Sequence, residues 1–334
     1  MDLLCDGRRY EAWEIMKIVF MGTPQAAAVS LSRLIDEGHD VRGVYTQPDR
    51  PSGRGKKIVF SPVKELAVTH KMAVFQPSKI KTSEVIDEFR SLEADVAVVV
   101  AYGRILPEPF LSAFPHGAIN VHFSLLPKYR GAAPVNWAIV NGESETGVTT
   151  MKMDNGLDTG DILLQRATAI GTNETAVELM ERLADVGADL LIETLANIDS
   201  ITPLEQNEDN ASLAPILKKE DGLIDWKLNA EDIALRVRGF QPFPTSYTFH
   251  EGQRLTVWSV IPVDRNESAN AGTIIEATGD NLVVSCGNNT ELLIIEIQPE
   301  GKRRMTVRDF LNGTRLKIGD RLSSIRSEAE AANQ

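Results

Sequence analysis

Two hydrophobic patterns alternate along the N-terminal part of the chain. Short runs of consecutive apolar residues, such as 95–101, are typical of strands buried on both faces of a sheet. Amphipathic stretches that begin near capping residues and end near glycine predict helices between them. The predicted strands are one that starts at Met16 and others at 40–45, 74, 95–101, 118–121, 147–153 and 161–169, and the predicted helices are 24–38, 62–71, 82–92 and 175–196. This order predicts an α/β fold with a parallel, doubly wound sheet.

The C-terminal part has a different pattern, which follows a polar interruption at 202–212. A helix is predicted at 229–238, and short β-rich runs follow it at 246–250, 255–260, 273–276, 282–286 and 292–297. Short strands with turn signals between them, closed by a short helix at 306–311, predict a small barrel.

The domains predicted from these patterns are an α/β domain at 16–203, a linker at 204–217 and a barrel domain at 218–323. Residues 1–15 and 324–334 do not share the patterns of the fold and are expected to be disordered extensions. Met16, which stands directly before the first apolar run, is a candidate for the natural start of the chain.

Composition and charge narrow the functional classes. The 334 residues are 43% apolar and 25% charged, which is typical of a folded, soluble protein with two cores. Cys5 and Cys286 are too few for a disulfide framework or a thiolate metal site, so we expect a reducing, cytoplasmic location and no metal. No segment resembles a signal peptide or a membrane span, and no coiled-coil pattern indicates an oligomer, so a monomer is expected. The net charge of -12 disfavours indiscriminate nucleic-acid binding, so any RNA contact must be local.

Candidate chemistry is concentrated after the predicted strand 118–121. Alternate residues of a strand share a face, so Asn120 and His122 are expected to point to the same side. An amide and an imidazole placed together can stabilise negative charge on a carbonyl oxygen, and a carboxylate can orient the imidazole. Asp154, Asp158 and Asp161 all lie in a glycine-containing stretch that could supply this carboxylate or serve only as turn residues.

The first turn, Gly22-Thr23-Pro24, follows a strand and precedes a helix that Thr23 is expected to cap. A dinucleotide-binding turn needs further glycines for close approach of the pyrophosphate, and this chain has Pro24 and Ala27 there. A nicotinamide-dependent dehydrogenase is therefore a poor hypothesis, although the helix start could still meet one anionic group.

A long segment at 46–57 alternates turn-forming residues with Arg50, Arg54, Lys56 and Lys57. Most basic runs are solvated surface, but this one lies in a predicted flexible loop where glycines permit close approach to a partner. Arginine suits phosphate and base-edge contacts, so the loop is a candidate RNA-binding element.

The order of several motifs carries a resemblance. These are Asn-x-His at 120–122, Ser-Leu-Leu-Pro at 124–127, Arg-Gly-Ala-Ala-Pro at 130–134 and Leu-Asp-Thr-Gly-Asp at 157–161. From about Lys17 to Leu322 the chain resembles the folate-dependent formyltransferases. The resemblance implies a Rossmann-like catalytic domain followed by an OB-like β-barrel domain that binds tRNA.

The resemblance also implies roles for individual residues. Asn120 and His122 would stabilise the oxyanion, and Asp158, at the Asp position of Leu-Asp-x-Gly, would orient His122 and raise its pKa so that a protonated ring is present near neutral pH. The co-substrate would be 10-formyltetrahydrofolate, with no metal. Its implied contacts are Arg104, Ile105 and Leu106 along the pterin ring, and Ser124, Leu125, Leu126 and Pro127. Phe123 stands where relatives usually have a small residue, and strand alternation predicts that it points away from Asn120 and His122.

In this family the basic loop enters the acceptor stem of initiator tRNA, and Arg54 falls at an important arginine. The expected activity is transfer of a formyl group to the α-amino group of methionyl initiator tRNA. A formyltransferase that acts on a sugar nucleotide or another small amine would share the catalytic residues but leave the basic loop unexplained. A non-catalytic RNA-binding protein would explain the loop but leave Asn120, His122 and Asp158 idle.

Overall fold

The computed structural model describes residues 15–52, 57–263 and 269–325, which form two compact units that interleave along the chain. The first unit contains the described residues up to Arg130, together with Gly147–Thr168 and Met180–Leu213. The second contains Gly131–Thr146, Ala169–Leu179 and the described residues from Ala214 onward. The division of the chain into domains at 203/204 and 217/218 stays a prediction.

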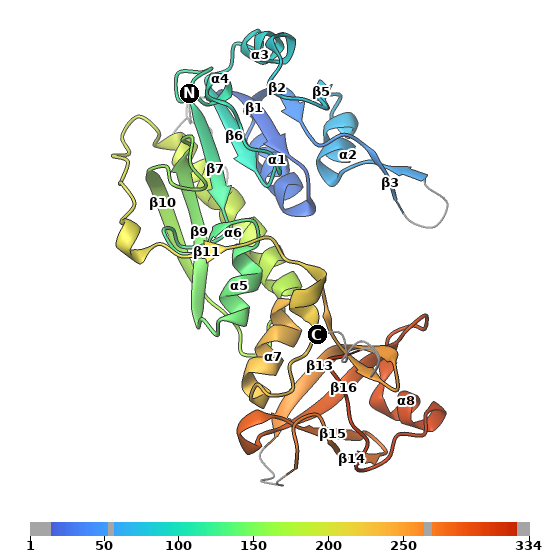
Figure 1. Ribbon diagram of the computed structural model, residues 1–334. Helices are drawn as coiled ribbons and strands as arrows, with labels where there is room; N and C mark the ends of the chain where they lie inside the picture. Colours follow the sequence, from blue (N-terminus) through green and yellow to red (C-terminus); the bar gives the residue numbers. More distant parts are fainter. Residues whose placement is uncertain (1–14, 53–56, 264–268, 326–334) are drawn as a thin grey trace, which may run out of the picture. The chain divides into compact units, whose positions relative to one another are not determined.

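A seven-stranded sheet forms the centre of the first unit, in the order β10-β9-β7-β6-β1-β2-β5 (Figure 1). Its strands are β1 (Lys17–Gly22), β2 (Asp40–Tyr45), β5 (Val74–Phe75), β6 (Val96–Val100), β7 (Ala118–His122), β9 (Glu145–Lys152) and β10 (Ile162–Ala169). The five strands from β5 to β7 are parallel, and β9 runs antiparallel to β7. The predicted doubly wound α/β fold is therefore confirmed, with a reversal of direction at β9.

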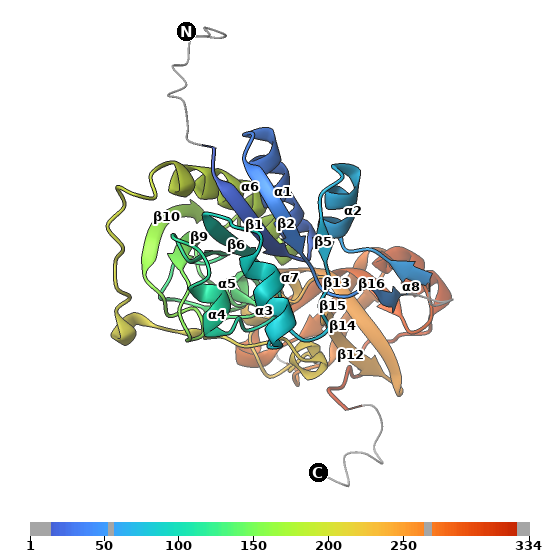
Figure 2. The same ribbon diagram turned by 90° about the horizontal axis from the view of Figure 1, so that it is seen from above.

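Helices cover both faces of this sheet (Figure 2). One face carries α1 (Gln25–Asp36), α2 (Pro62–Thr69) and α6 (Ala176–Ala196), and the other carries α3 (Ser83–Arg90) and α4 (Glu108–Leu111). Because both faces are covered, β6 is buried along its whole length, which explains its unbroken apolar sequence. Phe89 of α3 and Phe110 of α4 pack with Val99 of β6 and Ala118 of β7 in one core cluster. The residues that alternate with Ala118 along β7 therefore point to the α3/α4 face.

The turn after β1 departs from the sequence expectation. Helix α1 begins at Gln25, with Pro24 before it and no side-chain cap. The Thr23 hydroxyl instead accepts a hydrogen bond from the backbone N–H of Gln47, at 3.3 Å. The prediction that Thr23 caps the helix is wrong because this hydroxyl binds the segment that follows β2.

The predicted basic loop is an antiparallel hairpin of β3 (Arg50–Ser52) and β4 (Lys57–Val59). The expectation of an irregular loop is wrong for these flanks, where the backbone pairs in register from Arg50 opposite Val59 to Ser52 opposite Lys57. Arg54 and Lys56 lie outside the described residues.

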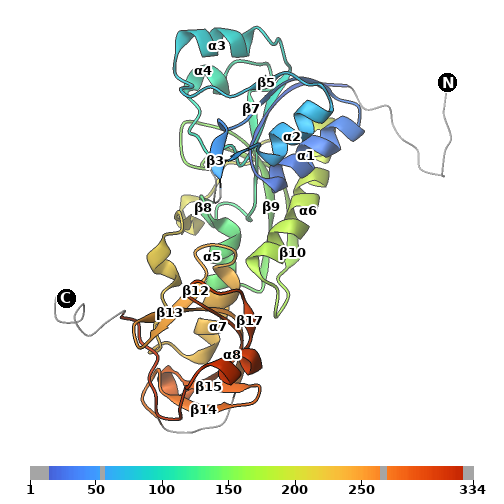
Figure 3. The same cartoon turned by 90° about the vertical axis from the view of Figure 1, so that its right-hand side faces the viewer.

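The second unit combines a helix pair with a six-stranded antiparallel sheet (Figure 3). Helix α5 (Pro134–Val140) packs on α7 (Ala230–Gly239), where Trp137 meets the Phe240 ring edge to face. The sheet contains β12 (Ser246–His250), β13 (Gln253–Val263), β16 (Glu291–Pro299), β15 (Asn281–Ser285) and β14 (Ile274–Thr278), with β17 (Met305–Thr306) beside β16 and the helix α8 (Val307–Gly313) after it. The remaining short elements of the chain are β8 (Arg130–Gly131), β11 (Leu213–Ala214) and three 3-10 turns at Glu208–Asn210, Lys219–Gly222 and Gly287–Asn289.

The sheet of the second unit closes through its last described residues. Ser323 exchanges two backbone hydrogen bonds with Phe249 of β12, while the carbonyl of Asp320 accepts from Ile274 of β14. The same short segment thus pairs with both edge strands. The prediction of a small OB-like barrel is confirmed. Within the described ranges, no helix is long and apolar enough to cross a membrane.

We predict that Gly187→Val destabilises the first unit. Helix α6 lies so close to the sheet that a Cβ at Gly187 would stand 3.0 Å from Val121 and 3.4 Å from Phe123. Overpacking of this kind costs about 1–3 kcal/mol of unfolding free energy. Gly313→Val is the matched control, because nothing lies within 4 Å of its Cβ position. Urea denaturation followed by circular dichroism measures both variants, and equal stabilities would contradict the close approach of α6.

Candidate active site

The end of β7 presents two polar side chains to the α3/α4 face of the sheet. Asn120 pairs with Val99 of β6 and Met151 of β9, while Ile119 and Val121 occupy the opposite face. Asn120 is only 8% exposed, and its side-chain amide has no hydrogen-bond partner among the residues that the structure describes. The amide atoms are not among the fully enclosed unpaired side-chain atoms of the described residues, so a ligand can reach them. Asn120 is therefore placed to bind a polar group of a substrate.

His122 lies one alternation further along β7 and is buried. Its Nε2 is 2.9 Å from the carbonyl oxygen of Tyr129, and its Nδ1 is 3.7 Å from a carboxylate oxygen of Asp158. A carbonyl oxygen only accepts hydrogen bonds, so Nε2 carries a proton. In the neutral ring, Nδ1 is therefore the basic nitrogen, and it faces the carboxylate.

Burial lowers the pKa of His122 below its usual value, while the Asp158 carboxylate and the Tyr129 carbonyl oppose this shift. Asp158 raises the pKa of His122 as expected, but the loss of water around the ring lowers it more, so the net shift is downward. In its neutral form the ring can accept a proton at Nδ1.

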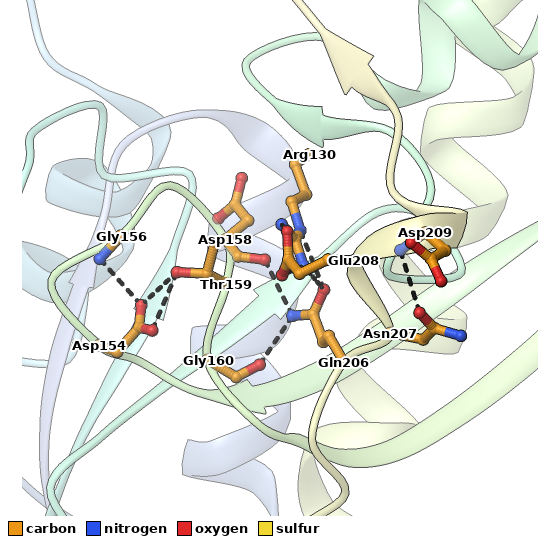
Figure 4. A network of polar contacts seen from close by, with 10 residues as sticks. All are labelled: Arg130, Asp154, Gly156, Asp158, Thr159, Gly160, Gln206, Asn207, Glu208 and Asp209. Atoms are coloured by element: carbon orange, nitrogen blue, oxygen red, sulfur yellow. Dashed lines mark hydrogen bonds and ion pairs between the residues drawn. The ribbon is translucent and has the colours of Figure 1, made fainter.

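Asp158 lies in the turn between β9 and β10 (Figure 4). Asp154 has the turn-forming role in this segment, since its carboxylate accepts hydrogen bonds from the N–H of Gly156 and the hydroxyl of Thr159. Of the three aspartates considered from the sequence, Asp158 is the one whose carboxylate faces His122. The structure thus brings Asn120, His122 and Asp158 together.

Left-handed backbone conformations gather around these residues. Ala101 after β6, Tyr129 and Asp158 have φ angles of 45°, 63° and 54°. For residues other than glycine, each such conformation costs about 1 kcal/mol or more and persists where surrounding contacts enforce it. Two of the three lie directly against His122, through the Tyr129 carbonyl and the Asp158 carboxylate.

The predicted folate segment 124–127 follows β7 and is fastened internally. The Ser124 hydroxyl donates to the carbonyl of Lys128, at 2.6 Å. The Thr149 hydroxyl donates to the Ser124 carbonyl and accepts from the N–H of Leu126. Leu126 is buried against Met151, the cross-strand neighbour of Asn120, whereas Leu125 and Pro127 are partly exposed. The segment therefore forms a fixed wall beside Asn120.

The second predicted folate segment follows β6. Leu106 is buried and Ile105 is 78% exposed, while Arg104 is partly exposed. The Arg104 guanidinium donates to the carbonyl of Ser78 and to the side-chain oxygen of Gln47. Gln47, which the sequence analysis did not single out, also donates to the Tyr102 carbonyl and so joins the ends of β2 and β6.

A cavity of about 570 Å³ opens where β1, β2 and β6 end. It is lined by Thr23, Gln47, Phe60, Tyr102 and Gly103, and by the exposed Arg50 at the base of the hairpin. Ligands of open α/β sheets bind at the carboxyl ends of strands, and this cavity lies there. Of the other predicted tRNA contacts, Lys57 begins β4, and Arg54 and Lys56 fall outside the described residues.

Gln206 near Asp158 was missed by the sequence analysis, and Arg130 was quoted there only as part of a motif. The side chain of Gln206 is buried against the Asp158 turn, and the buried Arg130 binds Gln206. Gln206 stands in a polar stretch that looks like a solvated linker, so nothing in its sequence neighbourhood signals burial. In the described ranges, no group of three or more His, Cys, Asp or Glu side chains is arranged to hold a metal ion.

Comparison with known proteins identifies the family of this chain. Residues 16–195 match the model of the formyl transferase family, and residues 216–315 match the model of the formyl transferase C-terminal domain. The chain belongs to the formyl transferase family. The N-terminal match of this formyl transferase includes Asn120, His122 and Asp158.

Curated relatives of this formyl transferase match it over nearly their whole length. A methionyl-tRNA formyltransferase of Alkaliphilus oremlandii is 48% identical over 307 residues, which cover 91% of this chain and 99% of the relative. One of Caldanaerobacter subterraneus subsp. tengcongensis is 49% identical over 307 residues, with the same coverage.

Solved structures share the fold of this formyl transferase at lower identity. A sugar 3N-formyl transferase, WlaRD, solved with dTDP and 5-N-formyl-THF, has a TM-score of 0.63 and 20% identity, over 87% of this chain and 100% of that one. An N-formyltransferase from Helicobacter canadensis, in complex with folinic acid and dTDP-3-aminofucose, has a TM-score of 0.61 and 20% identity, over 86% and 100%. These similarities describe the fold alone.

We predict that His122 titrates below the ordinary histidine pKa of 6.5 and that Asp158→Asn lowers its pKa further, because the variant loses the attraction of the carboxylate for the protonated ring. As the pH falls, the His122 ring is protonated in the unfolded chain before it is protonated in the folded protein. His122 therefore lowers the free energy of unfolding as the pH falls from 6.5 to the folded pKa. NMR titration of labelled histidine measures the pKa, and His122→Gln identifies its signal among the five histidines. A value at or above 6.5 would contradict the dominance of burial.

Proposed function

We propose that this formyl transferase is a methionyl-tRNA formyltransferase. It transfers the formyl group of 10-formyltetrahydrofolate to the α-amino group of methionyl initiator tRNA. The observation that carries this proposal is the Asn120 amide, which has no hydrogen-bond partner among the described residues, beside the His122–Asp158 pair. Relatives that are 48–49% identical over nearly their full length bear the name of this activity and support the choice of substrate.

The side chains divide the reaction between charge stabilisation and proton transfer. Asn120 donates a hydrogen bond to the formyl oxygen and stabilises the negative charge that develops when the neutral amine attacks the formyl carbon. His122 accepts at Nδ1 the proton that the attacking amine releases, and the Asp158 carboxylate stabilises the imidazolium. His122 returns this proton to the folate nitrogen as its bond to the formyl carbon breaks. Protons balance within the site, and the nucleophile belongs to the tRNA.

The residues next to Asn120 suit a flat heterocycle that carries the formyl group. Leu125 and Pro127 offer partly exposed apolar surface, and Ile105 is exposed at the end of β6. Binding sites of this kind combine apolar walls with a few fixed polar groups. We propose segments 104–106 and 124–127 as the folate contacts. Two solved structures with this fold contain formyl-folates, which supports the choice of co-substrate.

The hairpin and the adjacent cavity are proposed as the site of the tRNA acceptor end. Arg50 is exposed at the start of β3, and Arg54, Lys56 and Lys57 follow it in the sequence. The cavity between this hairpin and the ends of β1 and β6 has room for an aminoacyl group. We further propose that the barrel domain at 218–323 contacts the tRNA and that the enzyme acts as a monomer in the cytoplasm, where charged tRNA is present.

The proposed chemistry is tested by formyl transfer to methionyl initiator tRNA, with free methionine and an amino sugar nucleotide as competing acceptors. Asn120→Ala should lower kcat by about 100- to 1000-fold, as expected for the loss of one oxyanion donor. Asn197→Ala is the control, because that exposed amide at the end of α6 binds only the Glu193 carbonyl among the described contacts. Transfer to the sugar nucleotide and not to the tRNA would refute the substrate but keep the chemistry.

The hairpin assignment makes a separate prediction. The double variant Arg50→Ala/Arg54→Ala should raise the KM for tRNA by about 10- to 100-fold, which corresponds to one or two lost charge-assisted hydrogen bonds. The KM for the folate should stay unchanged. Arg42→Ala removes an exposed arginine of β2 in the same unit and serves as the charge-matched control. An unchanged KM for tRNA would exclude these two arginines from the tRNA site.

A further inference from the structure

The backbone of the turn that carries Asp158 is bound by a side chain from a distant segment. The amide nitrogen of Gln206 donates to the carbonyl oxygens of Asp158, at 2.9 Å, and of Gly160, at 2.7 Å (Figure 4). Gln206 is 6% exposed, so these bonds form away from water. Both protons of one amide group are thus used to fix the backbone on two sides of Thr159.

The orientation of the Gln206 amide is set by Arg130. The guanidinium of Arg130 donates from Nε and Nη2 to the side-chain oxygen of Gln206, at 3.0 and 2.8 Å. This oxygen cannot exchange places with the nitrogen, because the nitrogen would then face two donors, Nε and Nη2 of Arg130. The buried charge of Arg130 is balanced by Glu208, which accepts from Nη1 and Nη2 at 2.9 and 2.7 Å. Every hydrogen bond in the series Glu208–Arg130–Gln206–Asp158 therefore joins a donor to an acceptor.

The same stretch of chain also holds the partner of the other ring nitrogen. The Ser212 hydroxyl accepts a hydrogen bond from the N–H of Tyr129 at 2.9 Å, and the Ser212 carbonyl accepts from the N–H of Arg130 at 2.8 Å. Tyr129 is the left-handed residue whose carbonyl binds His122. Residues 206–212 thus touch both left-handed residues that face the imidazole, Tyr129 and Asp158.

We propose that Gln206 is a positioning residue for the reaction, and that residues 206–212, named here the brace, hold Tyr129 and Asp158 at opposite sides of the His122 ring. The proposal rests on the proposed function for its kinetic consequence. Gln206 acts through the backbone of Asp158 and touches no reacting atom. Without its two hydrogen bonds, the left-handed turn relaxes and the carboxylate moves away from Nδ1.

The first test is Gln206→Met, which keeps the length of the side chain and removes its hydrogen bonds. We expect kcat to fall by roughly 10- to 100-fold, the usual effect of a small misplacement of a catalytic group. The KM values for folate and tRNA should change less than kcat. Among the described residues, Gln206 makes no hydrogen bond to the proposed binding segments, and the brace reaches them only where the N–H of Ser212 donates to the Pro127 carbonyl. Gln241→Met is the matched control. Gln241 is 8% exposed and likewise donates to two backbone carbonyls, those of Val237 and Trp258, in the second unit.

A double-mutant cycle separates positioning from a general loss of structure. In the Asp158→Asn background, Gln206→Met should lower kcat by no more than about twofold, because residues that act as a unit are not additive. A full additional loss in that background, or an unchanged kcat in the wild-type background, would overturn the proposal. If Gln206→Met does not fold, Arg130→Lys replaces it as the test. This variant keeps the charge but donates from a single nitrogen, and it should lower kcat by a smaller factor than the one expected for Gln206→Met.

An NMR titration distinguishes failure of the brace from failure of the proposed function. Gln206→Met should shift the pKa of His122 in the same direction as Asp158→Asn, whatever substrate the enzyme uses. Gln241→Met should leave the His122 signal unchanged. If the pKa of His122 shifts in Gln206→Met but the wild type transfers no formyl group to methionyl tRNA, the positioning role of the brace is supported and the proposed substrate is rejected. An unchanged pKa of His122 in a folded Gln206→Met variant would reject the positioning role of the brace.

Discussion

Removal of water from His122 is the constraint on which the rest of the site depends. The ring lies at the end of a strand that is buried along its length, so its charged form is costly unless nearby groups compensate. Compensation comes from a carbonyl on one nitrogen and a carboxylate near the other, and both belong to turns outside the sheet. Each turn adopts a backbone conformation that L-residues rarely take, which explains why so many of its backbone groups are hydrogen bonded.

The sheet supplies one half of this site with little freedom. Asn120 and His122 are fixed by pairing of β7 with β6 and β9, and the back of the strand is filled by α6 at Gly187. The other half comes from turns whose geometry depends on side-chain hydrogen bonds. Rigid elements thus set the direction of the polar groups, while the turns set the placement of the carbonyl and the carboxylate that face the ring.

Sequence patterns predicted what depends on periodicity. The structure confirms the parallel strands and the shared face of Asn120 and His122. It also confirms that Phe123 lies on the opposite face, toward α6, as alternation along a buried strand predicts. Features that depend on contacts between distant segments were wrong or missed. Thr23 binds Gln47 instead of capping its helix, burial outweighs Asp158 at His122, and Gln206 is buried in a stretch that looks like a linker. Local composition predicts none of these features, because each depends on a partner far away in the chain.

The Asn120 amide, which has no partner among the described residues, has a consequence for the end of the catalytic cycle. A site that hydrogen bonds a substrate oxygen discriminates against a molecule that lacks it, because that hydrogen bond is then lost. On the proposed function, the formyl oxygen leaves with the aminoacyl product, and the spent folate no longer carries an acceptor for Asn120. The reaction therefore weakens the hold of the enzyme on its own by-product, and the amide that stabilises the oxyanion also favours exchange of spent for fresh co-substrate.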